Sequence, residues 1–290
     1  MVLRLLAVPA VALLTLALAP WPAAERPSRA PAAATATTPG GRPSAAEWEA
    51  LLTADPVAAL QAARDRYAAE VTGVRAVLHK RERIAGELHP PEVVNVLTRE
   101  QPFAVRMLWV SGSRKVFGNA VEGALYAAGE NGGRMTVWRP SAFVSFLRTT
   151  DVSPTDGTAR SAARYSLAEA GLGHTLTRTL AAWTCARERG PGTIAYVGLR
   201  PVPELAGKRC HVLRRTCAPP ECDRFMASDP EPSGDPFATA TVLLDPETWL
   251  QVGAEMRRAD GELVASYHFR DVILNPTFTA KDFTREGLAK

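Results

Sequence analysis

The C-terminal part of the chain constrains the fold most. Between Thr241 and Phe283 the sequence contains three extended segments joined by two short turns, at Asp245–Thr248 and Asp260–Gly261. Strands joined by short turns pair antiparallel, because parallel strands need a crossover connection of a dozen or more residues. This segment carries no catalytic motif, so we expect an antiparallel sheet that acts as a scaffold.

Further extended segments precede this one at the short intervals that are typical of hairpins. They lie at Val74–Leu88, Glu92–Arg99, Phe103–Trp109, Lys115–Tyr126, Met135–Arg139, Thr193–Leu199 and Lys208–Thr216. Too few helical segments lie between them to serve as parallel crossovers. The sequence therefore predicts an α+β fold with a single antiparallel sheet and helices on one face.

Two helical regions are expected to cover that face. Ser44 and Glu47 form a capping box, and Asp55 followed by Pro56 marks the start of a second helix. This second helix has an apolar face of Val57, Leu60, Ala63, Tyr67 and Val71. The later region has an apolar stripe of Leu172, Leu176, Leu180 and Trp183. If two such regions do not fill a sheet of about eight strands, an apolar cavity remains.

Residues 1–24 are predicted to be a signal peptide. Arg4 precedes an almost entirely apolar run from Leu5 to Leu18, and small residues follow at Ala23 and Ala24. This run is shorter than the roughly 20 apolar residues that span a membrane, so an uncleaved N-terminal anchor is the weaker alternative. We therefore expect a periplasmic or secreted protein.

The rest of the chain divides by composition. Residues 25–43, rich in proline, alanine and threonine, predict a disordered tether, and residues 44–290 predict one folded domain. Within this domain the proline-rich residues 218–236 predict a long exposed loop. The net charge of +4 is small, and basic residues are interleaved with acidic ones, which argues against a nucleic-acid partner.

Four cysteines, Cys185, Cys210, Cys217 and Cys222, all lie in the second half of the chain. An even number in an exported protein favours disulfides, and four cysteines allow three pairings. One arrangement closes a small loop between Cys217 and Cys222 and joins Cys185 to Cys210. A zinc site is the weaker alternative because no CxxC pair is present, and free buried thiols are another.

No catalytic signature is present. The sequence lacks the GxSxG elbow, the HExxH zinc motif, the P-loop and a complete dinucleotide fingerprint. The five histidines are scattered without the spacing of metal ligands. We therefore expect a protein that is not an enzyme and has no catalytic residues, cofactor or metal.

The charged segment from Lys80 to Arg83 supports two interpretations. On a strand, Lys80 and Glu82 share one face while Arg81 and Arg83 share the other. The two arginines are candidates for binding an anionic headgroup or phosphate. The alternative, which we favour, is an edge strand that its charges protect from pairing with other chains.

Two groups of motifs resemble known families. Asp245-x-x-Thr248-x-Leu250, Tyr267-x-Phe269 and Asp271-x-x-x-Asn275-Pro276 resemble the closing strands of lipoprotein-localisation carriers of the LolA and LolB type. Regulators of the RseB and MucB type share that architecture. Upstream, Glu82-Arg83-x-x-Gly86-x-Leu88 and Gln101-Pro102-Phe103-x-Val105 resemble an uncharacterised family of secreted bacterial proteins known only as a domain of unknown function.

The resemblance implies a curved, half-open antiparallel barrel whose concave apolar face is covered by helices. In the carriers this face holds acyl chains, which implies a lipid or an acylated protein as the partner. The cavity positions implied are Val105, Met107, Trp109, Leu250, Val252, Tyr267 and Phe269. The alternative is a module for interaction or stress sensing in the cell envelope, with an envelope protein as its partner and no small ligand. In either case we expect a monomer.

Overall fold

The computed structural model describes residues 43–116, 119–140, 142, 148–190, 192–216, 220–229 and 232–289. The predicted signal peptide and all but the last residue of the predicted tether lie outside these residues. None of the helices in the described ranges is long and apolar enough to cross a membrane.

One open antiparallel sheet dominates the described residues and contains twelve strands. Its first half is formed by β1 (Gly73–Ile84), β2 (Glu87–Leu88), β3 (Glu92–Arg99), β4 (Ala104–Ser111), β7 (Gly123–Ala127), β8 (Met135–Trp138) and β9 (Thr149–Val152). The second half is formed by β10 (Ile194–Val202), β11 (Lys208–Thr216), β12 (Thr239–Leu244), β13 (Gln251–Arg257) and β14 (Leu263–Leu274). A separate hairpin pairs β5 (Lys115–Val116) with β6 (Asn119–Ala120). The α+β fold with one antiparallel sheet is confirmed.

The chain begins this sheet at its centre. From β1 it builds outward through β3, β4, β7 and β8 to the edge at β9, and it re-enters at the opposite edge through β10. The strands β11 to β14 then return to the centre, where β14 pairs with β1 from Val74–Leu274 to Glu82–Ala265. The last long strand therefore joins the first, and β1 has a neighbour on each side. The interpretation of Lys80–Arg83 as a protected edge strand is wrong.

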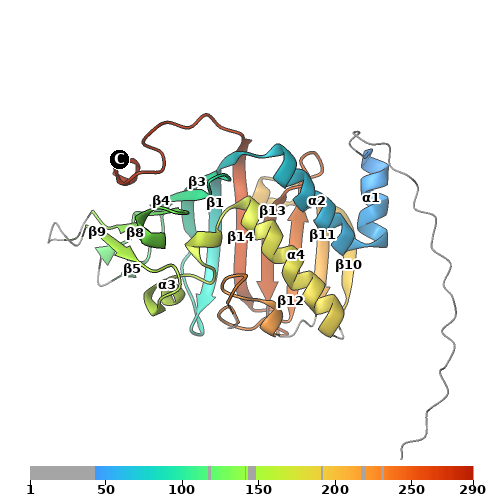
Figure 1. Cartoon of the computed structure of the whole chain (residues 1–290). Coiled ribbons are helices and arrows are strands. Elements are labelled where there is room, and N and C mark those ends of the chain that lie inside the picture. The colour runs from blue at the N-terminus through green and yellow to red at the C-terminus, as the bar shows by residue number, and fades with distance from the viewer. Residues whose placement is uncertain are drawn as a thin grey trace, which may run out of the picture. The chain divides into compact units, whose positions relative to one another are not determined.

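Four helices accompany the sheet in the described part of the chain. They are α1 (Ala45–Ala54), α2 (Pro56–Glu70), α3 (Gly157–Ala162) and α4 (Leu172–Arg189). In Figure 1, α2 and α4 lie side by side across the face of the sheet formed by β10 to β14, while α3 lies toward the β9 end. Both predicted helix starts are confirmed, since Ser44 and Glu47 form a capping box and Asp55 caps α2.

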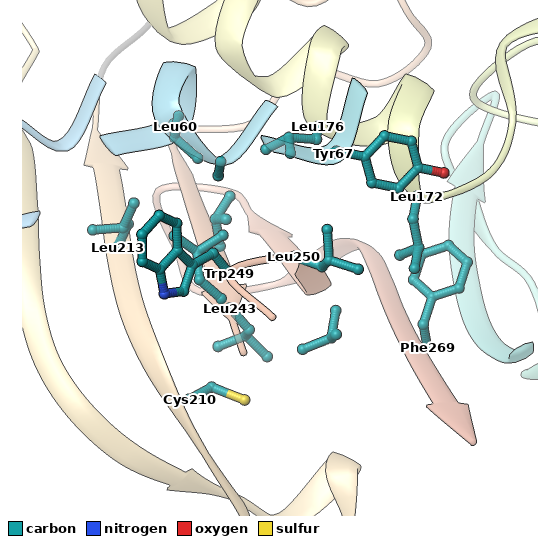
Figure 2. Close-up of a cluster of buried hydrophobic side chains, with 14 of the residues drawn as sticks. Leu60, Tyr67, Leu172, Leu176, Cys210, Leu213, Leu243, Trp249, Leu250 and Phe269 are labelled. Atoms are coloured by element: carbon teal, nitrogen blue, oxygen red, sulfur yellow. The ribbon is translucent and has the colours of Figure 1, made fainter. Parts of the chain in front are cut away.

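The core lies between these helices and the second half of the sheet. Figure 2 shows Leu60, Tyr67, Leu172 and Leu176 of the helices facing Leu213, Leu243 and Phe269 of the strands and Leu250, which directly precedes β13. Trp48 of α1 stacks on Trp249 with the ring centroids 4.1 Å apart and the planes 3° from parallel. Burial of large apolar side chains on both layers supplies most of the favourable free energy that holds α1, α2 and α4 on the sheet.

Glycine at the start of α4 permits a close crossing of two helices. A Cβ atom on Gly173 would lie 2.4 Å from Cε1 of Tyr67 on α2. Gly171, the N-cap, has a φ of +96°, and a Cβ there would lie 2.6 Å from Cγ2 of Thr98. The glycines weaken the helix start in isolation, but here they allow α4 to approach α2 and β3.

A smaller apolar cluster lies on the other face of the sheet. It consists of Leu97, Ala104, Leu125, Ala127, Phe283 and Leu288, with Leu108, Trp138 and Phe278 packed against it. The C-terminal segment therefore covers part of this face. Arg106 lies there as well, and its guanidinium forms an ion pair with Asp282 at 3.2 Å and donates to the Gly287 carbonyl.

The predicted exposed loop at 218–236 is packed instead. Cys222, Phe225 and Ser233 in this segment are buried, and residues 218, 219, 230 and 231 lie outside the described ones. A disulfide joins Cys222 to Cys185 of α4 and holds the segment against that helix. Such a bond fits an extracytoplasmic protein.

The cysteine pairing differs from the arrangement we considered. Cys185 pairs with Cys222, so neither Cys185–Cys210 nor Cys217–Cys222 is formed. Cys210 is a free, buried thiol, and burial raises its pKa to about 11. Cys217 lies outside the described residues.

The cap of α2 can be tested by mutation. Asp55 Oδ1 accepts hydrogen bonds from the backbone N–H groups of Val57 and Ala58, both at 3.0 Å. We expect Asp55→Ala to lower the free energy of unfolding by about 1 kcal/mol in urea titrations, because both donors lose their partner. Asp55→Asn retains an acceptor and serves as the control. Equal destabilisation by the two substitutions would contradict the capping role.

Candidate functional site

A partly open cavity of about 210 Å³ lies against the concave face of the sheet. Its walls come from β1, β4, β7, β8 and β9, from α3 and α4, and from parts of β11 to β14. One buried water needs only about 10–15 Å³, so the space is far larger than a packing defect. It lies beside the region where α2 and α4 pack tightly on the sheet, and α3 and α4 border it without filling it.

Four of the seven predicted cavity residues line this space. Met107 and Trp109 of β4 and Tyr267 and Phe269 of β14 are among its walls. The other three, Val105, Leu250 and Val252, are buried in the core and do not line it. Strand alternation identifies an inward-facing residue, but whether it meets a helix or a cavity depends on where the helices lie.

Most of the wall is apolar. Besides the residues above it includes Leu78, Val121, Met135, Val137, Val152, Phe225, Phe237, Val242 and Met256. Methionine and aromatic side chains adapt to irregular ligand shapes and contribute large apolar contact areas. This surface suits an aliphatic or aromatic ligand.

A compact cluster of buried charges forms one part of the wall. Lys80 Nζ lies 2.9 Å from a Glu82 oxygen and 3.4 Å from a Glu92 oxygen. Arg114 lies 3.3 Å from each of the same two carboxylates. Two cations and two anions therefore neutralise one another, as buried ion pairs must in order to offset their lost hydration.

Two aromatic donors complete this cluster. Tyr267 donates from its hydroxyl to Glu82 at 2.7 Å, and Trp109 donates from Nε1 to Glu92 at 2.6 Å. Burial alone would raise the pKa of Glu82, but Lys80, the Tyr267 hydroxyl and Arg114 together lower it below its ordinary value. Burial and the Glu82 charge raise the pKa of Tyr267. With Glu82 ionised and Tyr267 protonated near neutral pH, both are fixed structural partners rather than proton-transfer groups.

Arg81 and Arg83 do not line the cavity. Arg81 donates through Nε to the His89 carbonyl at 3.0 Å. Arg83 donates to the carbonyls of Leu263 and Gly86 and forms an ion pair with Glu262 at 3.1 Å. Their position on the outer side of β1 separates them from a ligand bound inside.

A second polar group lies where residues 220–229 border the cavity. Arg164 forms an ion pair with Asp223, and the hydroxyl of Tyr165 donates to the other oxygen of Asp223 at 2.9 Å. Arg178 of α4 lies over the Tyr165 ring, 4.1 Å from its centroid. Because Asp223 follows Cys222 directly, the disulfide helps to position this carboxylate.

Sequence reasoning missed the charged residues of the cavity. Lys80 and Glu82 share the face of β1 that also carries Val74, Ala76 and Leu78, all of them buried. Strand alternation could therefore have placed the pair inside. Nothing in the local sequence indicates that Glu92 and Arg114 would meet them, since these two residues come from other parts of the chain.

Comparison with known proteins supports the family predicted from the sequence. A family model described as "Protein of unknown function (DUF1571)" matches residues 71–287. No curated protein matches this chain.

Several solved structures are similar to this chain. A chain of the Pseudomonas aeruginosa MucA/MucB complex is 12% identical with a TM-score of 0.43, and the match covers 84% of this chain and 62% of that one. The Mycobacterium tuberculosis lipoprotein LppX is also 12% identical, with a TM-score of 0.42 and coverage of 78% and 99%.

A LolA superfamily protein from Nitrosomonas europaea is 11% identical, with a TM-score of 0.32 and coverage of 79% and 98%. The proteins matched are of the LolA-like and MucB-like kinds that the sequence resembles. At such low identities and TM-scores no function transfers to this chain.

The buried charge cluster should make stability depend on pH. The pKa of Glu82 is lower in the folded protein, so its stabilising contribution is complete above about its ordinary value of 4.5 and is lost as the pH falls below it. We expect Glu82→Gln to lower the free energy of unfolding by about 3–5 kcal/mol at neutral pH. The deficit relative to wild type should shrink in acid.

Glu262→Gln is the matched control, because Glu262 pairs with Arg83 at the surface. This substitution should cost less than about 1 kcal/mol. A Glu82→Gln deficit that stays constant from neutral pH to pH 3 in urea titrations would exclude the ionised carboxylate as its source.

Proposed function

Because this chain belongs to the DUF1571 family, which carries no assigned function, we propose a function from its own cavity. The protein binds an apolar ligand, a lipid or an acyl chain, in the concavity of the half-barrel. It acts as an exported, monomeric, non-enzymatic protein of the periplasm or the extracellular space. Residues 44–290 form the binding domain, and residues 1–24 and 25–43 act as signal peptide and tether.

The observation that carries this proposal is the uncovered apolar surface between α3, α4 and the first half of the sheet. An aliphatic ligand there would gain about 0.8 kcal/mol for each buried methylene. About ten buried methylenes would supply the roughly 8 kcal/mol that corresponds to micromolar binding, without any catalytic group. The predicted residues Met107, Trp109, Tyr267 and Phe269 contribute to the contact surface.

A second candidate function is an interaction module of the cell envelope. The observation that favours it is the other half of the concave face, where α2 and α4 already fill the space with core side chains (Figure 2). Under this alternative an envelope protein is the partner, and the cavity holds no small ligand. A stable protein partner captured by crosslinking in the envelope, together with a cavity that takes up no lipid, would favour it.

Narrowing the cavity should weaken ligand binding. Val152 is half-buried on the edge strand β9 and lines the cavity. Edge strands accept aromatic residues, so Val152→Trp should fold and place an indole into the ligand's space. We expect about tenfold weaker binding of dodecanol by the delipidated protein, measured by displacement of an apolar fluorescent probe.

Val110→Trp is the control, because Val110 is 57% exposed on β4 and does not line the cavity. This variant should bind dodecanol like the wild type. If the delipidated wild-type protein takes up no fatty acid, fatty alcohol, phospholipid or fluorescent acyl probe, the binding function is wrong.

A further inference from the structure

Arg215 is a buried cation in the cavity that lacks a carboxylate partner in the described part of the chain. It lies on β11 two residues after the buried Leu213, is only 2% exposed and lines the cavity. Its Nη1 donates to the Ala182 carbonyl of α4 at 3.0 Å, and its guanidinium lies 5.3 Å from the Phe237 ring centroid. The described residues leave Nε and Nη2 without a hydrogen-bond partner.

The other charges around the cavity are already paired. Lys80 and Arg114 neutralise Glu82 and Glu92, as described above, and Arg178 lies 3.7 Å from Glu169. Arg139 donates to the Thr150 hydroxyl.

The carboxylate that acts electrostatically on Arg215 is Asp223. One oxygen of Asp223 is held by Arg164 and the other by Tyr165, and no ion pair joins it to Arg215 among the described residues. The positive charge of Arg215 is therefore not balanced locally.

An uncompensated guanidinium in an apolar wall is costly. Burial lowers the pKa of Arg215, and the attraction of Asp223 does not restore it. A buried charge of this kind is stable only when a counter-charge and hydrogen bonds replace its lost hydration. Since the protein supplies neither in full, a bound anion would relieve the cost, and the flat guanidinium can donate two parallel hydrogen bonds to such a group.

We propose that Arg215 is an anion subsite and that the ligand is an amphiphile with one negatively charged group, a carboxylate or a phosphate. The charged group binds Nε and Nη2 of Arg215 while the aliphatic chain lies along the apolar wall toward Met256 and Phe269. This assignment rests on the proposed function and narrows it to anionic single-chain or acylated lipids.

The test compares ligands that share a dodecyl chain and differ in charge. Dodecanoate, dodecyl phosphate, dodecanol and dodecyltrimethylammonium are titrated into the delipidated protein against an uncharged fluorescent probe. The wild type should bind both anions at least about tenfold more tightly than the alcohol, the effect of roughly one charge-assisted hydrogen bond. The cation should bind most weakly, and the stronger of the two anions identifies the headgroup.

Arg215→Gln should remove the preference for anions over dodecanol, and circular dichroism with a thermal melt shows whether the variant is folded. Arg214→Gln is the matched control, because Arg214 is exposed on the same strand and loses the same charge. It should retain the preference.

Each negative result of the titrations contradicts a different statement. Absence of binding by every dodecyl compound would overturn the proposed function and this subsite with it. Equal binding of anions, alcohol and cation by the wild type would overturn the subsite alone, whether or not Arg215→Gln folds. An anion preference that persists in a folded Arg215→Gln would assign it to another residue.

Discussion

Pairing between β1 and β14 joins two halves of a sheet that separate stretches of the chain build. The register runs without a break from Val77–Arg270 to Glu82–Ala265, and it brings Lys80 beside Tyr267. Without the pairing of β1 with β14, the first half of the sheet would end at β1 and the second at β14. Each of these strands would then expose unpaired backbone N–H and C=O groups. The cavity extends across the β1–β14 pair, since its walls include residues of both halves of the sheet.

The positions of the helices then decide which part of the concave face is buried by packed side chains and which part borders the cavity. Between β9 and β10 the chain crosses from one edge of the sheet to the other, and α4 forms most of that crossing. It packs beside α2 over the second half, where Gly173 allows the close approach to Tyr67. The cavity is bordered but not filled by the short α3 and by residues 220–229. The Cys185–Cys222 disulfide joins these residues to α4.

The cavity wall combines an apolar surface with buried charged groups. Its apolar wall favours a hydrocarbon, whereas its buried charges require partners. The cluster of Lys80, Glu82, Glu92 and Arg114 neutralises its own charge and forms a polar part of the wall. Arg215 does not have this compensation within the described residues, and for that reason it distinguishes among ligands rather than only supporting the fold.

Local sequence patterns were sufficient for the elements themselves. The extended segments and short turns marked β3, β4 and the three closing strands. The caps at Ser44 and Asp55 marked the first two helices, and the stripe from Leu172 to Trp183 marked α4. These signals depend on neighbours within a few residues, so the elements can be predicted without knowledge of the tertiary structure. The Ser/Thr-rich region that contains β9 and α3 has no such periodicity, and both elements were missed there.

The sequence by itself determined the antiparallel α+β class and the small number of helices relative to strands. Only the tertiary structure decided that β1 is central, that Cys185 meets Cys222, and that Glu92 and Arg114 join Lys80 and Glu82 at the cavity wall. It also separated Met107 and Phe269, which line the cavity, from Val105 and Leu250, which are buried in the core. Alternation along a strand assigns a face, but the partner on that face comes from residues distant in sequence.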